Sequence, residues 1–181
     1  ILTSPGEINV ANKVILDYPE GADPYPYYPD PWPEVWELED FYGDQVEDGT
    51  RYYTNKVIDI IGVNTTLGPT YVDGELDIVN TSGTPATLTL NGTVYATGIT
   101  EIGTTGKEFT LFLNSQTIFV SSSVTDNQYA LTIGGQCIVK GPGIIVAIGD
   151  IQFKPKSQVG ELAGGGPIFI LSVIGTSYIQ P

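Results

Sequence analysis

A line of sequence that recurs along the chain is the feature that most limits what it can fold into. Leu88–Gly98 (LTLNGTVYATG) returns as Leu131–Gly141 (LTIGGQCIVKG), and Leu111–Val120 is a degenerate copy, so the copies start 23 and then 20 residues apart. A weaker copy, Val72–Ile78, lies 18 residues before the matching stretch of the first. Strand-forming residues with Gly or Asn at the corners, repeated about every twenty residues, predict an all-β fold, a β-solenoid that we expect to be a right-handed β-helix. A β-sandwich, which also has short, closely spaced strands, is the alternative.

The recurring line also predicts which side chains stack inside the solenoid. If the first and last copies are equivalent, Gly92 and Gly135 occupy equivalent corners, and Val94 and Cys137 lie in one interior column. The run Gly143–Ile148 (GIIVAI) is continuously apolar rather than alternating. Such a run is typical of a strand that is buried on both faces.

Composition divides the chain into three parts. Residues 1–16 contain a predicted strand, Glu7–Leu16. Residues 17–56 form an irregular, acidic, Pro-, Tyr- and Trp-rich segment, called here the strap, with a short helix expected over Glu34–Tyr42 because Pro33 suits the first helical position. Residues 57–181 are predicted to form the solenoid domain.

The charge of the chain excludes several classes of function. It has 21 acidic and 7 basic residues, a formal net charge of −14, no His and a single Cys. Such a surface repels phosphate backbones, so nucleic acid is not an expected partner. Serine-protease, cysteine-protease and zinc chemistry require an imidazole or several thiolates, so the composition excludes their usual forms. We expect no cofactor apart from a candidate calcium ion. The longest apolar runs, 144–148 and 167–171, are too short to span a membrane.

Three stretches resemble prokaryotic pilus-associated or polymer-forming surface proteins with a bactofilin-like or right-handed β-helical body. They are Leu67–Ile78, Leu90–Gly98 and Gly141–Ile151, and the similarity covers roughly residues 60 to 155. The resemblance implies a secreted or cell-surface structural protein and carries no catalytic residues. The chain departs from pilins by lacking their hydrophobic N-terminal helix. Because it starts at Ile1 and contains no Met, we expect a processed product.

Three functions are compatible with these features. The first is a structural subunit or surface module of an extracellular prokaryotic filament or cell-surface assembly, which is not an enzyme. The second is a carbohydrate-binding adhesin, and the third is a polysaccharide-degrading β-helix enzyme. Asp73, Glu75 and Asp77 alternate along one predicted strand, so we expect their carboxylates to project to one side. Two carboxylates within about 10 Å in a cleft would favour the enzyme.

Calcium is the metal that the composition favours, because a hard cation prefers several oxygen ligands. Acidic residues are concentrated in the strap, interleaved with turns, although no EF-hand or nonapeptide calcium repeat is present. The candidate ligands are Asp23, Asp30, Glu37, Asp40 and Asp44. The alternative is an acidic, solvated surface.

The aromatic residues of the strap are the candidate binding residues for a glycan or a protein partner. They are Tyr25, Tyr27, Tyr28, Trp32 and Trp36. Tyr and Trp can stack on sugar rings, and they can equally pack on the solenoid as a lid or fill a groove on a neighbouring subunit. We expect packing, because a proline-rich segment without regular hydrogen bonds needs large apolar anchors.

Three sequons suggest glycosylation of a surface protein. They begin at Asn64, Asn80 and Asn91. The prediction has low specificity, because such triplets occur often by chance in β proteins rich in Thr and Asn.

The ends of a solenoid expose unpaired backbone groups, so they must be capped or paired with another chain. The C-terminal stretch, residues 166–181, is apolar and uncharged, and Glu7–Leu16 is similarly strand-like. We therefore expect a homo-oligomer or filament in which one of these two segments adds as a strand to a neighbour.

Overall fold

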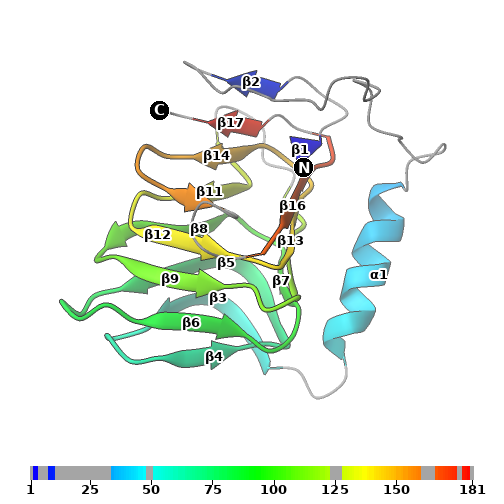
Figure 1. Cartoon of the computed structure of the whole chain (residues 1–181). Coiled ribbons are helices and arrows are strands. Elements are labelled where there is room, and N and C mark those ends of the chain that lie inside the picture. Colours follow the sequence, from blue (N-terminus) through cyan, green and yellow to red (C-terminus); the bar gives the residue numbers. More distant parts are fainter. Residues whose placement is uncertain are drawn as a thin grey trace.

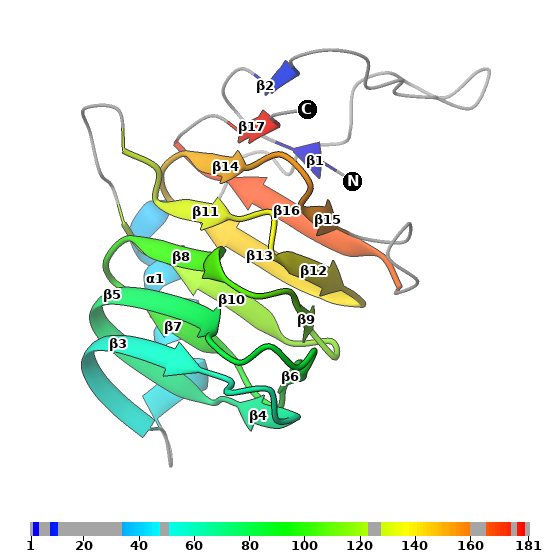
Figure 2. The same ribbon diagram turned by 90° about the vertical axis from the view of Figure 1, so that its left-hand side faces the viewer.

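The chain winds through three walls of parallel β-strands, which confirms the predicted β-solenoid and excludes the sandwich (Figure 1). The computed structural model describes residues 2–3, 8–10, 34–47, 51–122, 128–159, 166–174 and 177–179. A 12-stranded sheet bends to supply two walls, and a five-stranded sheet supplies the third (Figure 2).

Wall 1 consists of the first halves of β3 (Arg51–Asp59) and β5 (Thr70–Asn80), β7 (Val94–Ala96), β10 (Thr117–Val120), β13 (Gly143–Ala147) and β16 (Ile168–Ser172). Wall 2 consists of the second halves of β3 and β5, β8 (Thr100–Gly106), β11 (Leu131–Ile133), β14 (Ile151–Phe153) and β17 (Ser177–Ile179). Wall 3 consists of β4 (Thr65–Leu67), β6 (Thr87–Leu90), β9 (Phe109–Phe112), β12 (Cys137–Lys140) and β15 (Gln158–Val159).

The corner between walls 1 and 2 depends on glycine. In β5 the chain turns this corner without ending the strand, so β7 pairs with Thr70–Val72 and β8 pairs with Leu76–Asn80. Gly74, at the bend, has φ +113°, a conformation that residues with a Cβ rarely adopt. In the next rung a Cβ on Gly98 would overlap the backbone of Gly74. The two rungs can therefore stack this closely because residue 98 is glycine, whereas glycine at position 74 permits the positive φ of the bend.

The predicted alignment of the repeats is partly right. Leu88 and Leu111 pair in register on wall 3, as the spacing of the first two copies predicts. The third copy is displaced by one wall, because Leu131 lies on wall 2 and Cys137 pairs with Phe109 on wall 3. Val94 lies on wall 1, so the prediction that it shares a column with Cys137 is wrong, although both side chains are fully buried.

A helix, α1 (Val35–Glu47), covers the outside of wall 1 (Figure 1). The helix predicted at Glu34 is thus confirmed and extends beyond Tyr42. Its Tyr42 ring stacks on Phe119 with centroids 4.7 Å apart, and Val46 packs in the same cluster with Val146 and Ile148. Since Ile145 and Ala147 face the interior core, the run 143–148 is buried on both faces as predicted. No helix among the described residues is long and apolar enough to cross a membrane.

The N-terminal strands extend the far end of the solenoid. β1 (Leu2–Thr3) pairs with β16, and β2 (Ile8–Val10) pairs with β17, so the predicted N-terminal strand adds to the last rung rather than the first. At the opposite end β3 is the outermost strand of walls 1 and 2 (Figure 1). The solenoid therefore begins at Arg51, within residues 17–56, which the sequence analysis assigned to the strap. The sequence did not reveal this strand because β3 contains Tyr and Asn residues and lacks the apolar alternation of an interior strand.

The packing of α1 gives a first prediction. Tyr42 is 8% exposed against Phe119, whereas its neighbour Phe41 is 58% exposed. Tyr42→Ala is expected to lower the free energy of unfolding by about 3 kcal/mol, since it leaves a cavity under the helix. Phe41→Ala is the control and is expected to lower it by no more than about 1.5 kcal/mol, since its exposed ring makes only an edge-to-face contact with Tyr42. Urea unfolding followed by circular dichroism measures both, and equal losses would contradict the packing described here.

Candidate functional site

The outer face of wall 2 carries a column of polar side chains. Leu131 and Ile133 face the core on either side of Thr132, and Ile151 and Phe153 do so on either side of Gln152, so the middle residue of each short strand faces outward. In register with these lie Glu101 on β8 and Asp77 on β5. The column therefore runs across four neighbouring strands along the axis of the solenoid.

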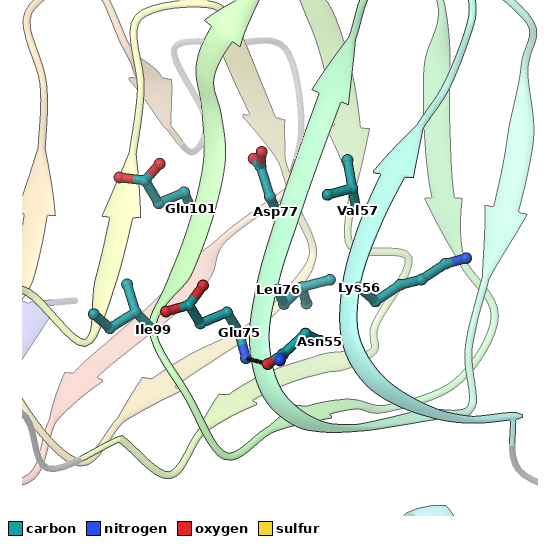
Figure 3. Close-up of a pocket in the computed structure, with 8 residues that line it drawn as sticks. All are labelled: Asn55, Lys56, Val57, Glu75, Leu76, Asp77, Ile99 and Glu101. Atoms are coloured by element: carbon teal, nitrogen blue, oxygen red, sulfur yellow. Dashed lines mark hydrogen bonds between the residues drawn. The ribbon is translucent and has the colours of Figure 1, made fainter.

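Two adjoining hollows lie over this column. The first has a volume of about 410 Å³ and is lined by Asn55, Lys56, Val57, Glu75, Leu76, Asp77, Ile99 and Glu101 (Figure 3). The second has a volume of about 300 Å³ and is lined by Ile99, Glu101, Gln128, Tyr129, Thr132, Gln152 and Lys154. Because Ile99 and Glu101 line both hollows, the two form one trough, called here the wall 2 trough.

Two of the three carboxylates of the trough lie side by side. Asp77 and Glu101 are register partners on β5 and β8, and Figure 3 shows their carboxyl groups on the same side of the sheet. Desolvation raises the pKa of Asp77, and repulsion by Glu101 raises it further. Asp77 Oδ1 is enclosed and has no hydrogen-bond partner among the described residues, whereas Glu101 Oε2 accepts a hydrogen bond of 3.0 Å from Thr104 Oγ1.

The predicted row of three carboxylates on β5 does not form. Asp73 precedes the bend at Gly74 and accepts hydrogen bonds from Tyr52 Oη (3.1 Å) and Thr97 Oγ1 (3.3 Å) at the corner. Glu75 and Asp77 follow the bend and line the trough. The second carboxylate beside Asp77 is that of Glu101, which comes from the next rung and which the sequence analysis did not single out. The alternation of residues within one strand does not reveal this proximity, but the pairing register between rungs does.

The position of Glu75 is fixed by its backbone. Glu75 N donates a hydrogen bond of 2.8 Å to Asn55 Oδ1, drawn as a dashed line in Figure 3. Asn55 lies at the β-bulge of β3, where φ is +43°. The amide of Asn55 thus ties the outermost strand to the corner and shapes one end of the trough.

The structure gives no calcium site in the part of the chain that it describes. Glu37, Asp40 and Asp44 lie on α1, and none of them joins a group of three described His, Cys, Asp or Glu side chains suited to a metal ion. Glu37 Oε2 instead accepts a hydrogen bond of 2.7 Å from Glu34 N at the start of the helix. Asp23 and Asp30 lie outside the described residues.

Of the candidate aromatic residues, the structure describes Trp36 alone. It is exposed on α1, while Tyr25, Tyr27, Tyr28 and Trp32 lie outside the described residues. A different aromatic row is present on wall 1, where Tyr52, Tyr71, Tyr95 and Phe119 stack face to face at 5.0–5.2 Å. Because neighbouring rings cover one another and α1 packs against Tyr95 and Phe119, the row is a packing feature.

Only two of the three sequons are accessible in this fold. Asn80 is fully buried, and its Nδ2 donates to Thr84 O (3.0 Å) and Glu108 O (3.1 Å). A glycan on Asn80 is therefore incompatible with the folded chain. Asn64 and Asn91 are exposed, and their glycosylation stays a prediction.

The single cysteine offers no reactive group. Cys137 is fully buried, and desolvation strongly raises the pKa of its thiol. The thiol therefore stays protonated and behaves as a small apolar side chain, as the sequence predicts.

Comparisons of the chain with family models, curated proteins and solved structures give no significant match. Functional assignment therefore depends on the geometry of the trough and of the solenoid ends.

The raised pKa of Asp77 gives a second prediction. When the pKa is higher in the folded than in the unfolded chain, the folded state binds more protons between the two values, so stability falls as the pH rises through that range. Asp77→Asn is thus expected to raise the melting temperature at pH 7 and to lose this advantage below the ordinary pKa of a carboxyl group. Glu75→Gln, which removes a charge from the same trough, is the control and should give a smaller increase. Melting curves across pH measure the effect, and an Asp77→Asn variant that melts below the parent at pH 7 would contradict it.

Proposed function

We propose that this chain is a structural subunit or surface module of an extracellular prokaryotic assembly, and that copies associate through the β3 end of the solenoid. The observation that carries the proposal is the difference in length between the edge strands at the two ends. At one end the described edge strands are β1 and β2, which have two and three residues. At the other end the edge strand is β3, which has nine residues and pairs with β5 on one side and with no further described strand on the other.

The exposed apolar side chains of the first rung support this proposal. Tyr52, Val57, Ile61 and Val63 are each more than half exposed. A nine-residue strand edge beside apolar side chains is a template for pairing with another chain, unless charges or bulges block it. Arg51, Lys56 and the bulge at Asn55 limit this pairing, which favours a specific partner over uncontrolled aggregation.

The partner end differs from the one expected from the sequence. Residues 166–181 and Glu7–Leu16 were candidates for strand addition to a neighbour, but β17 pairs with β2 and β16 pairs with β1 within the same chain. Because β1 and β2 offer only short strand edges, contact between two β3 ends is the arrangement we propose. It is an isologous interface, in which the same surface is used by both copies.

A third prediction tests this interface. The mass of the parent chain, measured by sedimentation velocity, is expected to rise with concentration. Ile61→Lys combined with Val63→Lys should keep the chain monomeric, because like charges then face one another across the interface. The control places the same charges near the opposite end, in Phe169→Lys with Ile174→Lys, whose parent side chains are also more than half exposed. This control should associate like the parent.

Two outcomes would overturn the proposal. The first is a parent chain that stays monomeric at the highest attainable concentration. The second is a control variant that loses association as completely as the β3-end variant. Electron microscopy of the associated material then distinguishes a closed dimer from a longer assembly.

A further inference from the structure

The backbone groups of β3 at the open end of the solenoid follow a fixed pattern. In a parallel pair, alternate residues of a strand direct their N–H and C=O groups to the neighbouring strand. Arg51 N and Ile60 N donate hydrogen bonds to the backbone oxygens of residues 69 and 79, so both residues face β5. The bulge at Asn55 interrupts the alternation once between them. Tyr52 and Val57 therefore direct their backbone groups to the free edge.

The side chains of the same two residues lie on the outer face of the solenoid. Tyr52 stacks on Tyr71 in the aromatic row of wall 1, and Val57 lines the wall 2 trough (Figure 3). Tyr52 is 63% exposed and Val57 is 61% exposed. A strand added at this edge would give both residues backbone hydrogen bonds and would bury their apolar side chains.

The bend of β3 limits which strand can be added. Residues 51–54 pair with β5 on wall 1 and residues 56–59 pair with it on wall 2, so the free edge turns the corner at Asn55. A straight strand can follow only one of the two walls. A second copy of β3, turned over about a two-fold axis through the corner, follows both, because wall 1 of each copy then meets wall 2 of the other. The bent edge is therefore complementary to itself, with the two strands antiparallel.

Charge also favours a second copy at this end. The first rung, residues 51–69, carries Arg51 and Lys56 against the single acid Asp59, which gives it a formal charge of +1. The whole chain has a formal net charge of −14. Two copies that meet through their first rungs therefore avoid bringing acidic surfaces together.

We infer that two copies pair their β3 strands antiparallel, with Tyr52 of each copy opposite the partner's Val57. This register rests on the association through the β3 end proposed above. Opposite residues of an antiparallel pair project to the same face, as Tyr52 and Val57 do. Both residues also direct backbone groups to the free edge, so each pair exchanges two hydrogen bonds. Because of the two-fold axis the pair occurs twice, once on either side of the corner.

One other register satisfies both the bend and the backbone pattern. It places Thr54 opposite the partner's Val57 and Tyr52 opposite the partner's Asp59. The Asp59 carboxylate already accepts hydrogen bonds from Thr81 Oγ1 and Thr81 N within its own chain. That register would set Tyr52 and Val57 against polar side chains, whereas the inferred one brings two exposed apolar side chains together.

The inferred pair is closed. Both β3 edges are used, so a third copy has no β3 edge to join. On the outer face, Asp77 and Val57 of one copy continue into the partner's Tyr52 and the partner's Tyr71 in one register column. The wall 2 trough of one copy thus ends against the aromatic row of the other.

Engineered disulfides test the register. Opposite residues that exchange hydrogen bonds in an antiparallel pair have Cα atoms about 5.5 Å apart, within the range of about 4.4–6.8 Å that a disulfide spans. Tyr52→Cys combined with Val57→Cys is therefore expected to become a covalent dimer under mild oxidation. Cys137 is fully buried and does not compete. Peptide mapping should find position 52 of one copy joined to position 57 of the other.

The matched control is Thr54→Cys combined with Val57→Cys, which belongs to the other register. In the inferred register these two positions are diagonal neighbours about 7–8 Å apart, so the control is expected to remain without the cross-link. Sedimentation under reducing conditions shows whether each variant still associates, and circular dichroism shows whether it is folded. Cross-linking of the control that equals or exceeds that of the first variant would overturn the register.

Hydrogen exchange of the parent chain tests the edge pairing without any substitution. The backbone amides of Tyr52 and Val57 are expected to exchange more slowly as the concentration rises and copies associate. The amides of Tyr53 and Ile58 are directed to β5 and should be protected in the monomer already. Equal exchange of Tyr52 and Val57 at low and high concentration, in a chain that does associate, would overturn the inference and leave the proposed function intact. A parent chain that never associates would overturn both.

Discussion

In-register parallel pairing between successive rungs is the constraint on which the other features of this molecule depend. Because each strand pairs with the strand one rung later, side chains are aligned in columns at a fixed spacing, inside and outside the solenoid. On wall 1 this alignment places Tyr52, Tyr71 and Tyr95 face to face, where ring stacking stabilises the column. On wall 2 the same alignment places Asp77 beside Glu101, where desolvation and then repulsion by Glu101 raise the pKa of Asp77. One backbone arrangement thus yields a stabilising column on one wall and an electrostatically costly column on the next.

The outer faces of the walls consequently differ. Wall 1 is apolar on its outer face, and α1 packs on this face. A hydrogen bond of 2.7 Å from Thr93 Oγ1 to Gln45 Oε1 also joins the wall to the helix. On wall 2, Asp77 Oδ1 has no hydrogen-bond partner among the described residues. The β3 end has an unpaired strand edge. The first of these surfaces holds α1 against the solenoid.

The extent to which the sequence predicts this structure depends on how local each feature is. The Leu88–Leu111 register was predictable because both residues lie in strands of equal length one rung apart. The Val94–Cys137 alignment failed because ten residues separate β10 from β11, whereas three separate β7 from β8, and this longer corner shifts the repeat by one wall. A stretch of two short apolar strands joined by a turn is compatible with any of the three corners of the solenoid. The sequence pattern alone therefore does not identify the walls on which its strands lie. Glu101 was missed for a related reason, since its proximity to Asp77 depends on pairing between rungs. Helix α1 was predictable from Pro33 and the residues after it, but nothing in its sequence indicated that wall 1 would be its partner.

The pairing of β1 with β16 joins residues that are 168 positions apart, and it orders the events of folding during synthesis. The strands from β3 onward can each add to a rung that already exists, so most of the solenoid forms through contacts between neighbouring rungs. β1 and β2 leave the ribosome first but have no strand to pair with until β16 and β17 have been made. A chain interrupted before β16 therefore leaves β1 and β2 without strands to pair with, and only a chain extending through β17 can add both N-terminal strands to its last rung.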